Sequence, residues 1–375
     1  MGVTDTAAGR PRGAHPSAGH GRSATGYRSS RSGPLCWGQQ WHWFDDMVPE
    51  ERRLFTLPVI DHCEIPAGAS SADVHAALRI VARRHEILRT TVLRLHPRQD
   101  VHDDDELGWD VAEVAVDRLD ATTLQEVEDR LTEAAIDIER TRLWRARIVT
   151  TARIPRFLVV VAHHVALDGW GLGVLLEEVH GLLAAREATS VPDSLAGHHP
   201  LDQAAAETGL DDRPAVDRWV QLLADNPVNV LAPHRGHGET GGHHATMYRS
   251  RRALADAVAI AREHATSTEM VLYTALVHLI ASRTGWYRFL AAVVVSNRSR
   301  AALRRSLGVY ALPVPVQVDA EPRWSFTNLL AQASTACLRA YRHSRYSPDH
   351  LTMALARQAA ERGLLGAPVL EVSFF

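Results

Sequence analysis

An unbroken apolar run followed by polar residues and glycines constrains the fold of this chain more than any other stretch. The run Phe157–Ala162 is rich in valine, which is typical of a strand buried on both faces of a helix-covered sheet. His163 and His164 follow where that strand should end, and Asp168 and Gly169 then form a turn pair. Leucines and valines recur at helical spacing beyond them. The sequence therefore predicts a strand, an imidazole-bearing turn and a helix, within an α/β fold.

The residues after the strand favour a functional site. Polar groups at the end of a buried strand open into a crevice, where open α/β sheets bind their ligands. A single histidine in such a place is usually a hydrogen-bonded structural residue, whereas two histidines with an acid and glycines indicate function. Successive strand residues point to opposite faces, so we expect only one of His163 and His164 to face the crevice.

The composition is that of a globular protein with two domains, or with two lobes that share one crevice. The chain has 375 residues, of which 46% are hydrophobic and 23% charged. Its formal net charge of -3 gives no general attraction to nucleic acid or to an anionic membrane. No stretch approaches the roughly 18 apolar residues that a membrane span needs. Cys36, Cys63 and Cys337 are scattered and odd in number, which favours a reducing, cytoplasmic location.

The order of elements divides the chain into three parts. Residues 1–31 are rich in Gly, Ser, Ala and Arg and lack apolar periodicity, so we expect a disordered tail. Strand, helix and strand recur in both halves of the remainder, so we expect an N-terminal lobe at 32–225 and a C-terminal lobe at 226–375. The acidic run 103–106 and the histidine-rich run 233–244 are interpreted as loops. Neither offers rigid ligand spacing, and we expect no metal site.

Four stretches, in order, resemble the motifs of one enzyme family. His163–Gly169 is similar to the His-His-x-x-x-Asp-Gly signature of the condensation domains of nonribosomal peptide synthetases, in the chloramphenicol acetyltransferase-like superfamily of CoA-dependent acyltransferases. Arg84–Thr91 resembles Arg-His-Glu-x-Leu-Arg-Thr, and Ile136–Arg147 resembles Phe-Asp-Leu followed by Leu-x-Arg-Ala. Leu35–Trp43 is more loosely similar to Ser-x-Ala-Gln-x-Arg-Leu-Trp, with its first or second glutamine in the glutamine place.

This resemblance implies a fold and a reaction. The fold would be two chloramphenicol acetyltransferase-like lobes, each a mixed sheet with helices, with the active-site tunnel between them. The chain would be a free-standing condensation enzyme that joins a carrier-tethered acyl or aminoacyl thioester to an amine or hydroxyl acceptor. It would bind no cofactor of its own, since its substrates come on the 4'-phosphopantetheine of carrier proteins. Its partners would be peptidyl or acyl carrier proteins or other synthetase modules.

The resemblance also assigns roles to the site residues. His164 matches the active-site histidine, which removes a proton or only orients the nucleophile. Gly169 supplies a turn conformation and a backbone donor toward the oxyanion. Asp168 faces away and holds the loop by pairing with a buried arginine, for which Arg298 is the matching position, and His163 is structural. The substrate tunnel is expected to include four further residues: Trp170, Ser296, Asn297 and Tyr310.

Two departures from the family pattern lie in the second half. Gly308–Val316 looks like Gly-x-Phe-x-Asn-x-x-Pro, but the asparagine falls on Leu312 and the arginine that often follows falls on Gln317. Residues Val369–Phe375 resemble a strand that family members place well before their end. The C-terminal lobe is therefore expected to be incomplete, either as a minimal version or completed by another chain.

Two other interpretations stay open. His163 and Asp168 also satisfy the His-x-x-x-x-Asp spacing of glycerolipid acyltransferases, which are usually membrane-associated. A catalytically inactive condensation-like module that docks a carrier or recruits an enzyme is the second alternative. Leu312 and the expected lack of C-terminal elements favour that module, and the intact histidine motif opposes it.

Overall fold

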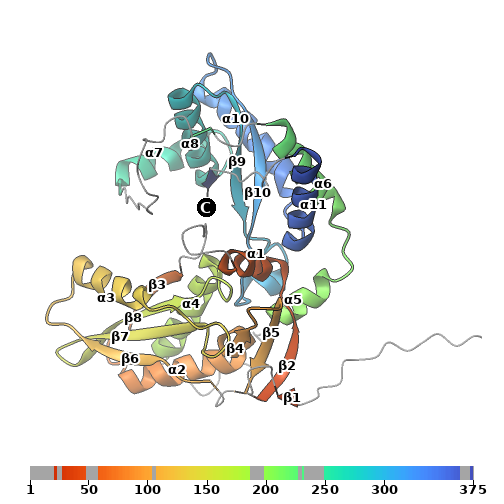
Figure 1. Cartoon of the computed structure of the whole chain (residues 1–375). Helices are drawn as coiled ribbons and strands as arrows, with labels where there is room; N and C mark the ends of the chain where they lie inside the picture. The colour runs from red at the N-terminus through yellow and green to blue at the C-terminus, as the bar shows by residue number, and fades with distance from the viewer. Residues whose placement is uncertain are drawn as a thin grey trace, which may run out of the picture.

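Two α/β units, joined by crossing segments, make up the computed structural model (Figure 1). The structure describes residues 21–22, 28–47, 58–103, 107–185, 198–226, 230–231, 249–363 and 372–374. The histidine-rich run 233–244 and most of the acidic run 103–106 lie outside these residues.

The central sheet of the N-terminal unit contains the predicted buried strand. Its four strands, in sheet order, are β3 (Val59–Glu64), β8 (Ile154–Ala162), β7 (Trp144–Thr151) and β6 (Val111–Ala115). Leu158 to Ala162 are all buried, with alternate residues in two separate cores. Burial on both faces confirms the interpretation of the valine-rich run.

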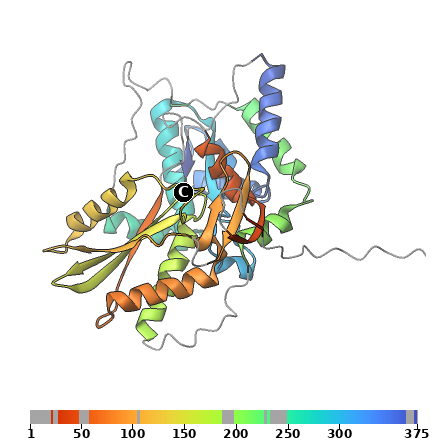
Figure 2. The ribbon, with the colours of Figure 1, turned by 60° about the horizontal axis from the view of Figure 1, so that its bottom comes forward.

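Helices cover both faces of this sheet. α3 (Ala121–Glu133) packs on one face, where its Val127 and Leu131 contact Val159 and Val161. α2 (Ser71–Arg84) and α4 (Gly169–Ala185) cover the other face, and Figure 2 shows them together there, in orange and yellow-green. α2 begins at the expected serine, because Ser70 and Asp73 form a reciprocal capping box.

A second sheet corrects the expected start of order. Its strands, in sheet order, are β1 (Gly21–Arg22), β2 (Arg28–Pro34), β5 (Arg98–His102) and β4 (Thr90–Val92), and a 3-10 helix, η2 (Glu86–Arg89), precedes β4. Residues 28–31, predicted to belong to the tail, therefore form the first half of β2. Backbone pairing with β5 and the bonds of Arg31 to Glu86 and Asp202 hold this strand. Neither contact leaves an apolar pattern in the sequence.

The C-terminal unit is built on three strands, with β9 (Arg288–Val295) between β10 (Leu312–Asp319) and β11 (Ser373–Phe374). α8 (Thr268–Thr284) and α10 (Phe326–Tyr341) pack on one face. α6 (Arg213–Asp225) and α11 (Pro348–Glu361) form a second cluster with Leu290 and Leu312. The remaining helices are α5 (Pro200–Glu207), α7 (Arg251–Glu263) and α9 (Ala301–Arg304).

Among the described strands, β10 lies at the edge of its sheet, as its prolines predict. Pro313 and Pro315 lie opposite Val294 and Ala292 of β9. A proline has no N–H to donate, so these positions suit an edge, where they also discourage pairing with another strand. The expectation that another segment or chain completes this sheet stays a prediction.

Two segments cross between the units and position the site. α1 (Trp37–Asp46) lies between them in Figure 1; its Trp43 packs in the N-terminal core and its Trp37 in the cluster of α6 and α11. The second crossing segment follows β9 and runs from the C-terminal unit toward the N-terminal one, where its Leu307 packs in the core. α6 falls within the residues expected to form the N-terminal lobe, but it packs on β10 and α11. The exact lobe boundary stays a prediction.

Candidate functional site

The predicted turn follows β8 directly. The N–H of His163 donates to the carbonyl of Leu143 across the sheet at 2.8 Å, and the His163 carbonyl accepts from the N–H of Ala166 at 2.8 Å. Asp168 then caps α4, because its Oδ1 accepts from the N–H of Gly171 at 2.7 Å. The chain therefore reverses within a few residues and presents its polar side chains at the end of the buried strand.

His163 and His164 differ in their surroundings, as alternation predicts. The Nδ1 atom of His163 accepts from the N–H of Val165 at 3.1 Å, so this ring belongs to the hydrogen bonding of the turn. His164 instead lines a cavity of about 240 Å³ between the two units. The other lining residues come from α1, the turn and the C-terminal sheet: Trp41, His42, Asp168, Gly169, Trp170, Val294, Ser296, Ala311, Pro313 and Ser373.

Burial governs the charge of His164. It lowers the pKa of the imidazole below its ordinary value of 6.5, while Asp168 and the polar backbone at His164 and Leu167 act in the opposite direction. His163 adds to the lowering, because two like charges would repel. The ring is therefore neutral at pH 7 and can accept a proton or a hydrogen bond.

Sequence reasoning missed His42, which lies directly on His164. The centroids of the two rings are 3.8 Å apart and their planes differ by 11°. Burial lowers the pKa of His42 well below 6.5, and the neighbouring His164 and His163 lower it further. The sequence feature that could have pointed to His42 is its place in the aromatic stretch 35–44. With Gln39 in the glutamine place of the motif, the motif's leucine falls on His42.

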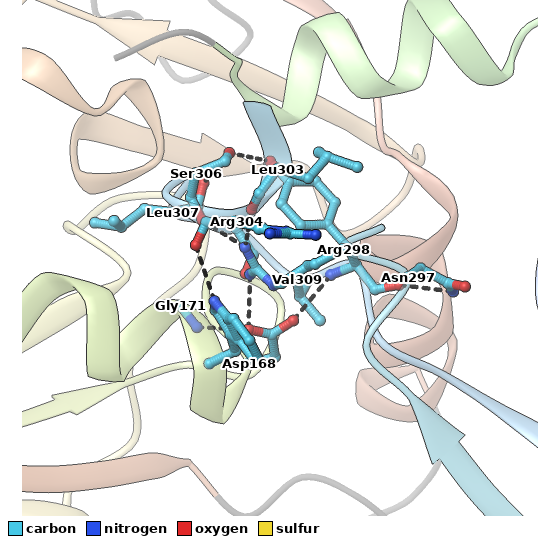
Figure 3. A network of polar contacts seen from close by, with 12 residues as sticks. Asp168, Gly171, Asn297, Arg298, Leu303, Arg304, Ser306, Leu307 and Val309 are labelled. Atoms are coloured by element: carbon cyan, nitrogen blue, oxygen red, sulfur yellow. Dashed lines mark hydrogen bonds and ion pairs between the residues drawn. The ribbon is translucent and has the colours of Figure 1, made fainter. Parts of the chain in front are cut away.

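Asp168 forms a buried ion pair with Arg298, which follows β9 (Figure 3). The distance from Nη2 of Arg298 to Oδ1 of Asp168 is 2.9 Å, and their side chains are only 1% and 6% exposed. Oδ2 of Asp168 accepts from the N–H of Tyr310 at 3.1 Å. Both carboxylate oxygens are thus engaged in holding the two units together.

Arg298 is also the centre of a set of backbone contacts (Figure 3). Its Nη1 donates to the carbonyls of Leu303 and Ser306, both at 2.7 Å, and its Nη2 donates to that of Gly308 at 3.0 Å. The guanidinium carbon lies 4.7 Å from the ring centroid of Tyr310, within range of a cation–π interaction. This one side chain therefore fixes the course of residues 303–310.

Glycines allow the crossing segments to approach closely. A Cβ on Gly38 of α1 would lie 2.3 Å from the carbonyl oxygen of Val309, and one on Gly171 would lie 2.8 Å from that of Gly308. Real Cβ atoms do not come this near to backbone, so any larger residue would push the loop away. The segment 308–310 fits between α1 and α4 only because these positions are glycine.

Gly169 lies directly after the turn, at the start of a helix. It is the first residue of α4 and is absent from the described glycines with positive φ, which are Gly68, Gly209, Gly285 and Gly363. Apart from its chain neighbours and the backbone of its own helix, an added Cβ would meet no described atom within 4 Å. Since Gly169 lines the cavity, its effect is to leave space beside His164. Its role as a backbone donor stays a prediction.

The predicted tunnel residues surround a second, larger cavity of about 610 Å³. Trp170 and Ser296 line both cavities. Trp170 is 51% exposed, and its Nε1 donates to the carbonyl of Arg304 at 2.9 Å. Tyr310 is buried, and its hydroxyl lies 2.6 Å from that of Ser306. Asn297 has φ of 54° and donates to the carbonyls of Tyr310 and Ser344, so it holds the turn after β9.

The structure gives no sign of a metal centre or a membrane span in the part that it describes. No three His, Cys, Asp or Glu side chains of the described residues gather as metal ligands would. None of the described helices combines the length and the apolarity needed to cross a bilayer.

Comparison with known proteins gives matches in both sequence and structure. The model of the condensation domain family matches residues 34–372. The chain is 28% identical over 344 residues to the probable non-canonical nonribosomal peptide synthetase CymA of Salinispora arenicola. That match covers 86% of this chain but 4% of the synthetase.

Solved structures share the fold. The first condensation domain of the calcium-dependent antibiotic synthetase superposes with a TM-score of 0.71 at 18% identity, covering 92% of this chain and 80% of that one. The X-domain from teicoplanin biosynthesis, in complex with OxyB, gives a TM-score of 0.64 at 21% identity, covering 94% and 79%. The expected chloramphenicol acetyltransferase-like α/β fold is thereby confirmed.

Proposed function

The chain belongs to the condensation domain family, and from that premise we propose that it is an acyltransferase acting on carrier-tethered thioesters. It joins an acyl or aminoacyl group to an amine or hydroxyl acceptor, which forms an amide or an ester. Condensation domains act on substrates that carriers present, within nonribosomal peptide and secondary metabolite biosynthesis. The position of His164 carries the proposal, since a neutral imidazole lies in a cavity where two units meet.

The reaction requires little more than placement and proton transfer. The nucleophilic nitrogen or oxygen of the acceptor attacks the thioester carbonyl carbon, and the carbonyl oxygen becomes an oxyanion. The carbon–sulfur bond then breaks, and the proton that the acceptor loses ends on the pantetheine sulfur. His164 either carries that proton or holds the acceptor by a hydrogen bond, and a neutral imidazole suits both roles.

The lining of the small cavity indicates which acceptors fit. Its walls are mainly apolar, with Trp41, Val294 and Pro313 among them. Asp168 is the only carboxylate among the described lining residues, and both of its oxygens are already engaged. An ammonium ion would therefore find no counter-charge here and would bear the full cost of desolvation. We expect the acceptor to react as an uncharged amine or hydroxyl.

The larger cavity suits the pantetheine arm. It adjoins the small cavity through Trp170 and Ser296, and Arg300, Arg304 and Arg345 line it. Cationic guanidinium groups bind phosphate well. A phosphopantetheine held there would have its thioester directed toward His164.

Product formation tests the proposal. A panel of aminoacyl-pantetheine thioesters is incubated with amine and hydroxyl acceptors, and mass spectrometry compares wild type with H164A after their melting temperatures are matched. We expect product from the wild type with a subset of substrates and none above background from H164A. A well-folded wild type that forms no product with any pair, including carrier-loaded thioesters, would contradict the proposal.

A docking module is the second candidate function. The X-domain whose fold this chain shares was solved as a complex with OxyB. Leu312, which stands where the family motif has asparagine, is buried among Trp37, Tyr346 and other apolar residues. A module of this kind would keep its partner affinity in H164A, whereas an enzyme would lose its product. Calorimetric titration with loaded carrier, run beside the product assay, distinguishes the two.

A further inference from the structure

We propose that His42 is a positioning residue for His164. The imidazole ring of His42 stacks on that of His164 and fixes the plane of the His164 ring within the cavity. The proposal rests on the proposed function, in which the orientation of His164 matters. The centroid distance of 3.8 Å and the interplanar angle of 11° place the two rings face to face. One face of His164 is thereby covered, and the ring cannot rotate freely about its Cβ–Cγ bond.

α1 holds His42 firmly in place. The N–H of Trp37, at the start of the helix, donates to Oε2 of Glu207 at 2.7 Å. Near its other end, Nε1 of Trp43 donates to the carbonyl of Leu93 at 2.8 Å. Gln39 is fully buried and bonds to the side chain of Gln99 at 3.1 Å. Because Trp37 also packs among residues of α6 and α11, His42 projects from a helix anchored to both units.

An imidazole at this position lowers stability relative to an apolar residue. His42 is 8% exposed, and its Nδ1 atom is buried without a hydrogen-bond partner among the described residues. Leaving a buried polar atom unpaired disfavours the folded state. A leucine or phenylalanine would fill the same space without that cost. The histidine also lines the cavity, so its placement points to the chemistry there.

The charges around the pair favour two neutral rings. The titratable groups that face them are His163 after β8 and Asp168 before α4, and Asp168 is already paired with Arg298. Burial disfavours a proton on either ring, and a proton on one disfavours a proton on the other. Both rings are therefore uncharged near pH 7, which keeps His164 available as an acceptor.

Three variants separate positioning from packing. H42F keeps a flat ring, H42L keeps the volume without the ring, and H42A opens the covered face of His164 to water. Each is assayed for kcat and KM, and the imidazole of His164 is titrated by NMR in the absence of substrate. We expect H42F to stay within about threefold of wild type, and H42L and H42A to lose about tenfold or more in kcat with KM nearly unchanged. Only H42A should move the His164 titration upward, toward pH 6.5, since water then reaches the ring.

The outcomes are distinct. A His164 titration that moves in H42A but not in H42F supports the stack, even if no variant forms product, in which case only the proposed function fails. Unchanged kcat and unchanged titration in H42L and H42A would overturn the proposal. If H42A does not fold, H42L decides alone, because retained kcat in a variant without the ring contradicts positioning.

Discussion

Asp168 and Arg298, which are 130 residues apart in sequence, meet in a buried ion pair at 2.9 Å and fasten the turn after β8 to the turn after β9. Each side chain satisfies other groups as well, so the pair is the centre of the contact between the units rather than an isolated salt bridge. The position of His164 depends on this contact, because His164 and Asp168 lie in the same turn.

We expect D168N to destabilise the protein strongly. Arg298 would remain buried without its counter-charge, and removing one partner of such a pair costs about 3–5 kcal/mol. Urea denaturation measures the free energy of unfolding, with D211N as the control because the Asp211–Arg213 pair is solvent-exposed. A soluble D168N with wild-type stability and no activity would instead indicate a direct catalytic role for Asp168.

Acid should weaken the fold as His42 and His164 gain protons. Burial lowers the pKa of both rings in the folded protein, whereas unfolded histidines titrate near 6.5. The unfolded chain therefore binds protons more readily, and the stability that these rings contribute is complete above pH 6.5 and is lost as pH falls through their folded pKa values. Urea denaturation at pH 8 and pH 5.5 checks this. Between pH 8 and pH 5.5, H42F should lose less unfolding free energy than wild type. An equal loss in the two proteins would assign the effect to other titratable groups.

Glu207 should act in the opposite direction. Burial raises the pKa of its carboxyl group from 4.5 to about 7, so the folded chain binds the proton more readily between these values. Stability linked to Glu207 is present at low pH and declines as pH rises toward 7. E207Q removes that term, and its unfolding free energy should fall more steeply than that of wild type on acidification. Identical pH dependence in the two proteins would show that burial does not shift the pKa of the Glu207 carboxyl group.

Two glycine substitutions test the close approach of α1 to the 308–310 loop. G38A would place a Cβ 2.3 Å from the Val309 carbonyl oxygen, and such overpacking costs typically about 1–3 kcal/mol. G173A is the matched control, since a Cβ in that part of α4 meets no described atom within 4 Å beyond its own helix. We expect G173A to be stabilised by about 0.5–1 kcal/mol. Thermal unfolding of wild type, G38A and G173A measures both changes in stability. A G38A variant as stable as wild type would argue against the tight contact.

The sequence predicts the strand and turn of the site because their signals are local. A valine-rich run must be buried, and Phe157–Ala162 is part of β8. The start of β2 could not be predicted, because Arg28 to Ser32 are held by strand pairing and by ion pairs of Arg31 with distant carboxylates. His42 was missed for a similar reason. Its contact with His164 depends on how α1 packs between the units, and no spacing within the chain reports that.

The rate of acyl transfer in wild type and H164A, measured with one active substrate pair, tests the central claim most directly. Both proteins are compared at pH 7.5 under single-turnover conditions, after their unfolding transitions are shown to coincide. If His164 moves the proton or orients the acceptor, the rate constant should fall about 10²–10⁴-fold in H164A. Equal rate constants in the two proteins would contradict the account, and the cavity at the end of β8 would then not be the site of acyl transfer.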